Sequence, residues 1–335
     1  MDPQPLVTIL RAWLNGDAVR TSLPNGVTHL AGQHRLNGTL YHIGAELSES
    51  DAAKAEESWS RNLAGHLSRS AALESIWADL EPRPLVFKGA DLAENLYDDP
   101  GARAANDLDL LLPEPAHTAV LDSLRHTVTR RPPPRGERFV DEPPYAVGFE
   151  CEGLLIELHR DPQPPHLAKL TGEMIYDRGT EGRLGELQVR FPTRQDRLLL
   201  WLTNQAKGAF FCDLAAWLDL CLILRDLTAL DLEAHHRTLR QSARTVGLVN
   251  AYDLALFRLD ASGLWPGTMP RIRRPGLLAI NALLPPILGP IGAPPTAKLQ
   301  CVKTWVCTAR ARVGLLRRAA ATLARGDRPG RGRKD

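Results

Sequence analysis

Residues 85–112 read LVFKGADLAENLYDDPGARAANDLDLLL, and the order of elements in this stretch decides the fold. The apolar run at residues 85–87 predicts a short strand that a Lys-Gly pair closes. Residues 90–97 predict a short helix, which the turn-forming sequence DDPG ends. A second strand is predicted over residues 107–112. The stretch therefore predicts a small α/β unit that begins with a strand, a helix and a strand.

The second of these strands alternates acidic and apolar residues. Because side chains of a strand point to opposite faces in turn, Asp107 and Asp109 share one face and the leucines between them face the core. A later strand, expected at residues 154–159, repeats the pattern with Glu157 and His159 on one face. If the two strands are neighbours in one sheet, the three carboxylates converge.

Clustered carboxylates repel one another and raise each other's pKa unless a cation lies between them. Oxygen ligands of this kind suit Mg²⁺ or Mn²⁺, with nucleotide phosphates completing the coordination shell. An Asp-x-Asp pair alone is weak support, because many solvated strand edges carry one. The residues before it strengthen the hypothesis of a phosphate and metal site.

Lys88 and Gly89 lie between a predicted strand and a predicted helix. Glycine lets the backbone approach a phosphate, and a helix N-terminus offers free N–H groups. Arg103 could add a forked phosphate contact. Taken singly, the three residues are explained as well by a solvated edge, a turn and a surface charge. Asp91, just inside the same helix, would either repel a triphosphate or cap the helix.

The rest of the 335-residue chain has the composition of a globular protein, with 44% hydrophobic and 24% charged residues. Helical periodicity dominates before residue 81 and again over residues 194–226, 231–259 and 297–324. Between these regions, residues 146–151 and 154–159 predict a hairpin, and residues 185–191 predict a further strand. We therefore expect an α+β fold with a small mixed β-sheet flanked by helical regions. The expected divisions are a helical lead-in (1–80), an α/β core (81–192), a helical domain (193–325) and a basic tail (326–335).

The N-terminus lacks the features of a secretory signal, and the most apolar stretch is interrupted by prolines, so we expect a cytoplasmic protein without a transmembrane segment. Residues 309–335 carry nine Arg or Lys residues against two Asp residues, a charge of +7 in a chain of net charge +2. A tail of this kind could contact nucleic acid, although a solvated tail is the simpler interpretation.

The quoted stretch resembles the signature of the uncharacterised bacterial nucleotidyltransferase family in the polymerase-β superfamily. That signature is an apolar strand, Lys-Gly, an apolar helix with a Tyr, Pro-Gly-x-Arg and an alternating acidic strand. Glu157-Leu158-His159 and the P-x-x-D-x-L-L motif from Pro192 resemble its later parts. The resemblance covers roughly residues 84–224. This chain departs from the superfamily pattern in using Glu157 where relatives often have Asp, and Lys-Gly where others have Gly-Gly or Gly-Ser.

The resemblance implies a nucleotidyltransferase core and a role for each residue of the site. It implies that Asp107 and Asp109 hold Mg²⁺ or Mn²⁺ and that Glu157 completes the metal site and helps to deprotonate an acceptor. The implied phosphate-binding residues are Lys88, Gly89 and Arg103. His159 could orient the acceptor, although a lone histidine is more often structural. Lys207 and Asp219 fall where the family often has polar residues that face the cleft, but salt bridges at the rim of the core are the favoured interpretation for both.

Three hypotheses about function follow. The leading one is a metal-dependent enzyme that transfers a nucleoside monophosphate from a nucleoside triphosphate, with ATP as the expected donor, to an unidentified small-molecule, peptide or nucleic-acid acceptor. The alternative is a non-catalytic regulatory module that keeps the nucleotidyltransferase fold and binds a nucleotide or a partner. The third, a transferase acting on nucleic acid, rests on the basic tail.

Overall fold

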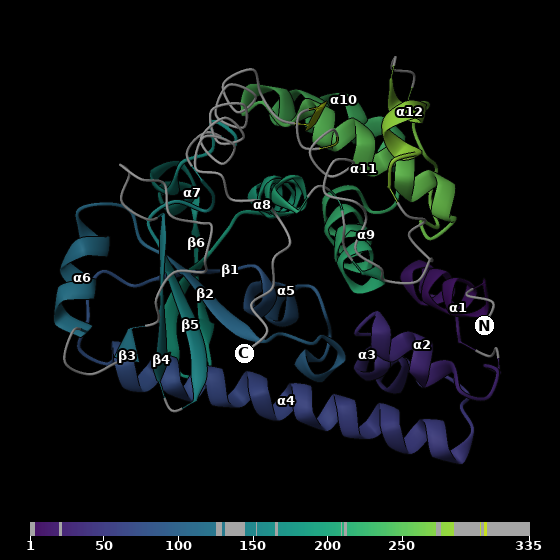
Figure 1. Ribbon diagram of the computed structural model, residues 1–335, viewed down its shortest axis with the longest axis horizontal. Coiled ribbons are helices and arrows are strands. Elements are labelled where there is room, and N and C mark those ends of the chain that lie inside the picture. The colour runs from purple at the N-terminus through teal and green to yellow at the C-terminus, as the bar shows by residue number, and fades with distance from the viewer. Residues whose placement is uncertain are drawn as a thin grey trace, which may run out of the picture.

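The fold combines one mixed β-sheet with helices that precede, cover and follow it (Figure 1). The α+β class expected from the sequence is therefore confirmed. The computed structural model describes residues 4–19, 22–124, 129–130, 145–151, 153–164, 167–208, 210, 213–272, 276–284, 302, 305 and 306. The expected helix at residues 297–324 lies almost wholly outside this part, and the basic tail lies entirely outside it.

Within the described residues the sheet has seven strands: β1 (Leu85–Phe87), β2 (Asp107–Leu111), β3 (Thr129–Arg130), β4 (Ala146–Cys151), β5 (Leu154–His159), β6 (Thr180–Leu184) and β7 (Leu187–Phe191). Their order is β3-β4-β5-β2-β1-β7-β6. Strand β2 is antiparallel to β1 and parallel to β5, and β1 is parallel to β7. The other neighbours are antiparallel. Strand β2 thus lies at the centre, paired along both edges.

The helices of the described chain are α1 (Gln4–Asn15), α2 (Val27–Gln33), α3 (Asn37–His42), α4 (Glu49–Trp77), α5 (Gly89–Asn95), η1 (Pro100–Ala102, a 3₁₀ turn), α6 (Ala116–Leu124), α7 (Gly172–Arg178), α8 (Arg194–Lys207), α9 (Leu214–Thr228), α10 (Leu232–Thr245), α11 (Val249–Ser262) and α12 (Leu277–Asn281). None of these described helices combines the length and the apolar character that a bilayer crossing requires.

Helix α4 covers one face of the sheet and extends beyond it beneath α2 and α3 (Figure 1). Its buried Leu73 and Trp77 belong to the same apolar cluster as Leu108 and Leu110 of β2. Helix α6 adds further apolar residues to this cluster. The leucines of the alternating strand therefore face the core, as the period of two predicts.

The opposite face of the sheet contributes to a second core. Leu85 and Phe87 of β1 and Leu111 of β2 belong to a cluster that also contains apolar residues from α1, α2, α8, α9 and α11. The N-terminal and C-terminal helices thus share one apolar core on the same side of the sheet as Asp109. The helical lead-in packs against the C-terminal helices as well as the sheet.

The predicted elements agree with the structure most closely in the sheet. The strand at residues 85–87 and the hairpin formed by residues 146–151 and 154–159 have the expected bounds. The expected divisions at residues 80/81 and 192/193 fall in connections between elements, and the division into domains stays a prediction. Strand β6 was not anticipated, because its sequence TEGRL is mostly polar and exposed at the edge of the sheet.

The helical stretches expected at residues 194–226 and 231–259 are each divided in two. The side chain of Asp213 accepts a hydrogen bond from the amide of Ala216, and this N-cap begins α9 after the end of α8. Gly247, with φ of +83°, lies in the turn between α10 and α11. Apolar periodicity continues across both breaks because the separate helices pack on the same core.

We predict that Trp77→Ala lowers the free energy of unfolding by about 3–5 kcal/mol, the usual loss for an aromatic side chain removed from a core. Trp77 is fully buried, and its Nε1 donates a hydrogen bond to the carbonyl of Pro82. The matched control is Leu67→Ala on the same helix, where the side chain is 60% exposed and a change within about 0.5 kcal/mol is expected. Urea denaturation measures both, and equal losses would contradict the assigned role of α4.

Candidate functional site

The parallel pairing of β2 with β5 aligns the acidic residues of the two strands. Asp109 lies opposite Glu157, and Leu111 lies opposite His159. The sequence predicted that the carboxylates converge if the two strands are neighbours, and this condition is met for Asp109 and Glu157. Asp109 is buried, whereas the side chain of Glu157 remains 35% exposed. One carboxylate is thus held inside the protein, and the other faces outward from the same site.

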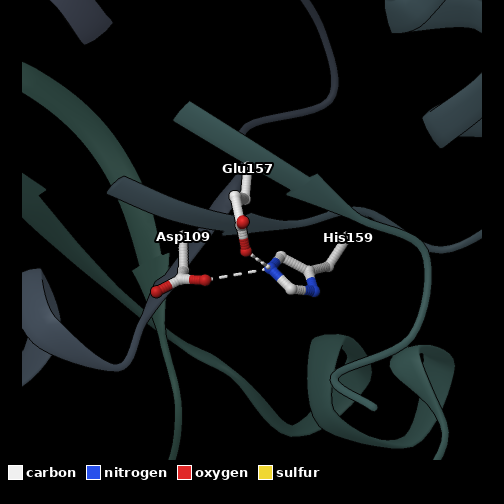
Figure 2. Close-up of side chains that lie close together, drawn as sticks. All are labelled: Asp109, Glu157 and His159. Atoms are coloured by element: carbon white, nitrogen blue, oxygen red, sulfur yellow. Dashed lines mark hydrogen bonds and ion pairs between the residues drawn. The ribbon is translucent and has the colours of Figure 1, made fainter. Parts of the chain in front are cut away.

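His159 joins the two carboxylates. Its Nε2 lies 2.9 Å from Oδ1 of Asp109 and 3.3 Å from Oε2 of Glu157 (Figure 2). Two carboxylate acceptors require a proton on Nε2, so this nitrogen donates. The other ring nitrogen, Nδ1, is buried and has no hydrogen-bond partner among the described residues. The ring is positioned further by Phe87, whose ring meets it edge-on at a centroid distance of 5.0 Å.

Lys88 supplies the positive charge of the site. Its Nζ lies 2.5 Å from Oδ1 of Asp109. The backbone of Lys88 has φ of +56° and ψ of −126°, a conformation that suits glycine and is costly for a residue with a side chain, by about 1–3 kcal/mol. Strain of this kind often accompanies function. Here it accompanies a lysine that reaches a buried carboxylate.

The charges at the site shift the pKa values of its carboxyl groups in different directions. Burial alone would raise the pKa of Asp109, but Lys88 and His159 outweigh burial and hold that pKa at about 2. The hydrogen bond from His159 lowers the pKa of Glu157, against the effect of burial. For Asp107, burial and the neighbouring Asp109 raise the pKa. Asp109 and Glu157 are therefore ionised at neutral pH.

Asp107 lies on the same face as Asp109, at the beginning of β2. Among the described residues, the group that could hold a metal ion consists of Asp109, Glu157 and His159, with ligand atoms within 4.8 Å of one another. Asp107 is outside this group, and its carboxylate interacts electrostatically with Arg69 of α4. The predicted metal-binding role of Asp107 stays a prediction.

Arg103 is engaged in a contact within the protein. Its guanidinium donates two hydrogen bonds to Asp219 of α9, at 2.9 and 2.8 Å, and Tyr97 donates a third to the same carboxylate. The interpretation of Asp219 as a salt-bridge residue agrees with this geometry. A forked contact from Arg103 to phosphate would have to compete with Asp219.

Gly89 allows the chain to pack closely where α5 begins. A Cβ atom at this position would lie 3.1 Å from Cβ of Ala105 and 3.2 Å from Nη1 of Arg103. Gly89 is buried, and helix α5 has only seven residues. The close packing accounts for the glycine, while its proposed contact with phosphate stays a prediction.

Asp91, considered from the sequence as a charge that repels a triphosphate or as a helix cap, makes no capping hydrogen bond and instead forms an ion pair within the protein. It is buried and accepts three hydrogen bonds, at 2.9–3.0 Å, from the guanidinium of Arg197 in α8. Burial raises the pKa of Asp91 to about 6 in spite of this partner. The pair connects α5 of the sheet region to the C-terminal helices.

A cavity of about 660 Å³ lies beside Lys88, between α5 and helices α8 and α9. Arg35, Arg103 and Arg197 contribute to its wall, and each is paired with an aspartate. Lys207 also lines the cavity, and its Nζ donates a hydrogen bond of 2.6 Å to the hydroxyl of Tyr145. Three arginine–aspartate pairs and two lysines thus line the cavity, which adjoins the carboxylate site at Lys88.

Tyr145 was not identified from the sequence, although it contacts the site. Its ring lies 6.0 Å from that of His159, centroid to centroid, and its hydroxyl accepts from Lys207. Lys207 lines the cavity, and its expected salt bridge at the rim of the core stays a prediction. Tyr145 belongs to no motif, and its contact with Lys207 depends on how α8 packs near the start of β4.

The donor set of the site fits a divalent cation. Two ionised carboxylates and an imidazole nitrogen lie close together, and Lys88 already pairs a positive charge with the buried member. Carboxylate oxygens suit Mg²⁺ and Mn²⁺, and an imidazole ligand favours Mn²⁺ of the two. Asp109, Glu157 and His159 therefore form a group that could hold a divalent cation.

Comparison with known proteins assigns the chain to a family. The model of the family described as uncharacterised nucleotidyltransferase matches residues 23–261, more than half of the chain. The protein therefore belongs to this family. The match begins before the stretch that carried the resemblance and extends through most of α11, so the helices on both sides of the sheet are part of the family's fold. No curated protein and no solved structure matches the chain.

We predict that Asp109→Asn destabilises the protein by about 2–3 kcal/mol at pH 7 in buffer containing EDTA. A carboxyl group with a pKa of about 2 in the folded state and about 4 in the unfolded state adds stability above pH 4. That stability is lost as the pH falls through 2, so the difference between variant and wild type should shrink between pH 4 and pH 2.

Urea denaturation at a series of pH values measures this difference. The control is Asp177→Asn, at an exposed position on α7, for which a change within about 0.5 kcal/mol is expected at every pH. A difference between Asp109→Asn and wild type that stays constant from pH 4 to pH 2 would contradict the assignment of Asp109 as an ionised buried group.

Proposed function

We propose that the protein is a divalent-metal-dependent nucleotidyltransferase that moves a nucleoside monophosphate from a nucleoside triphosphate to an acceptor hydroxyl. One observation carries the proposal: the pairing of Asp109 with Glu157 across β2 and β5, beside a lysine that also lines a cavity. The family to which the chain belongs supports the class of reaction.

Asp109 and Glu157 would hold the metal ion, Mg²⁺ or Mn²⁺, and His159 would orient both carboxylates. His159 would serve as a further ligand only after Nε2 gives up its proton. Asp107, on the same face of β2, would be an additional ligand. When bound, the ion would neutralise charge on the triphosphate and favour the ionised form of the acceptor hydroxyl. The buried position of Asp109 gives it a fixed place among these groups.

Glu157 is suited to accept the proton of the acceptor. It is the partly exposed member of the carboxylate pair, and its lowered pKa keeps it ionised. The acceptor oxygen would attack the α-phosphorus, the bond from that phosphorus to the bridging oxygen of the β-phosphate would break, and pyrophosphate would leave. His159 would hold Glu157 in place through its hydrogen bond during this step.

The cavity beside Lys88 is large enough for a nucleoside triphosphate, with ATP as the expected donor. Lys88 and Lys207 are suited to phosphate, because a lysine ammonium is a compact charge on a flexible stem. Leu92, Leu200 and Trp201 provide an apolar wall for the base. Arg103 supports this wall through its bond to Asp219.

We predict that the protein transfers label from an α-labelled nucleoside triphosphate to a component of cell extract in the presence of Mg²⁺ or Mn²⁺. The double variant Asp109→Asn/Glu157→Gln should lose transfer by at least about 100-fold, because both carboxylates act directly at the reaction. The control is Glu181→Gln on β6, an exposed carboxylate on the strand at the far edge of the same sheet, which should retain full activity.

Each of the four common nucleoside triphosphates would be tried in turn with the same extract. Absence of labelled product with all four, or equal product from the double variant, would contradict the proposal. Metal-dependent nucleotide binding in calorimetry without transfer would instead favour a non-catalytic binding module. The strained and fully paired Lys88 is the observation that keeps this second function in consideration.

A further inference from the structure

Lys88 combines three properties that the proposed reaction does not require together. Its backbone adopts a conformation that glycine takes without strain. Its ammonium contacts the same oxygen of Asp109 that His159 contacts. It also lines the cavity proposed to hold the nucleotide. A glycine would relieve the strain but would leave the buried carboxylate without its positive partner.

The contact with Asp109 meets a physical need of the site when no metal ion is bound. A buried carboxylate without a positive partner is strongly unfavourable. The side chain of Asp109 is 2% exposed, so water reaches it poorly. The ammonium of Lys88 thus stands where charge neutralisation by a metal ion would otherwise be required. A lysine side chain has enough freedom to leave this contact and turn to the adjoining cavity.

We propose that Lys88 is an exchangeable counter-cation, which neutralises Asp109 before a metal ion binds and then transfers its ammonium to a phosphate of the nucleotide. This inference rests on the proposed function in taking Asp109 as a ligand of the divalent ion. Metal ion and nucleotide then bind cooperatively, because the nucleotide accepts the ammonium that the metal ion displaces. A metal ion alone binds weakly, because it must displace Lys88.

The test is titration of the full-length, nucleotide-free protein with Mn²⁺, with free Mn²⁺ measured by electron paramagnetic resonance at constant pH. Lys88→Met and Lys88→Gly remove the ammonium, and both should bind Mn²⁺ at least about tenfold more tightly than the wild type. Lys88→Arg keeps a positive charge beside Asp109 and should bind Mn²⁺ no more tightly than the wild type. Lys88→Gly also removes the backbone strain, so a folded variant lacking the ammonium is expected even if Lys88→Met folds poorly.

Lys207→Met is the matched control, since Lys207 lines the same cavity but bonds to Tyr145. Its affinity for Mn²⁺ should change by less than about threefold. An equal gain in Lys207→Met would show that general electrostatics is responsible and would overturn the exchange. Unchanged or weaker binding in both Lys88→Met and Lys88→Gly would also overturn it.

The melting temperature provides a second readout that needs no transfer activity. Mn²⁺ should raise the melting temperature of Lys88→Gly more than that of the wild type, because only the variant lacks the ammonium beside Asp109. Equal shifts would count against the inference. The two proposals can fail separately. Tighter Mn²⁺ binding by the Lys88 variants without nucleotidyl transfer refutes the proposed function but supports the displacement of Lys88 by a metal ion. Transfer without tighter binding supports the proposed function and overturns the exchange.

Discussion

The burial of the Asp109 carboxylate is the constraint on which the site depends. A charge removed from water needs close partners, and losing one of them is strongly destabilising. The partners come from two directions: His159 from β5 and Lys88 from the end of β1. Strands β5 and β1 are both neighbours of β2. The ionised state of Asp109 therefore depends on the order of these central strands. Shifting β5 by one residue would turn Glu157 and His159 to the other face of the sheet.

What could be predicted from the sequence was the local part of this arrangement. The alternation in β2 and β5 assigns Asp109, Glu157 and His159 to faces, because the side-chain period of a strand is a property of the backbone alone. The pairing of β2 with β5 is not local, since Asp109 and His159 are 50 positions apart. The family resemblance supported that pairing, whereas the alternation of residues showed only that the carboxylates would converge if the strands were neighbours. The breaks between α8 and α9 and between α10 and α11 were missed because one apolar core serves both helices of each pair.

The roles of Arg103 and Asp91 were harder to predict for the same reason. Arg103 and its partner Asp219 are 116 positions apart, and Asp91 and Arg197 are 106 apart. In both pairs one member belongs to the stretch that carries the motif and the other to a helix of the C-terminal region. A motif defines which residues are close in the chain, but the packing of α8 and α9 against α5 decides which charges become paired. The charge of Arg103, which the sequence suggested was available for a ligand, therefore helps to hold the sheet region against the C-terminal helices.

The different use of arginine and lysine around the cavity follows from their chemistry. Arg35, Arg103 and Arg197 each offer a planar fork that matches a carboxylate, and each is paired with an aspartate of the wall. Such a pair is rigid and is costly to break once it is buried. Lys88 has one compact charge on a flexible stem, so it can leave Asp109 without dismantling a two-pronged contact. A site that must exchange one cation for another during a reaction is better served by lysine at this position, even where the backbone would favour glycine.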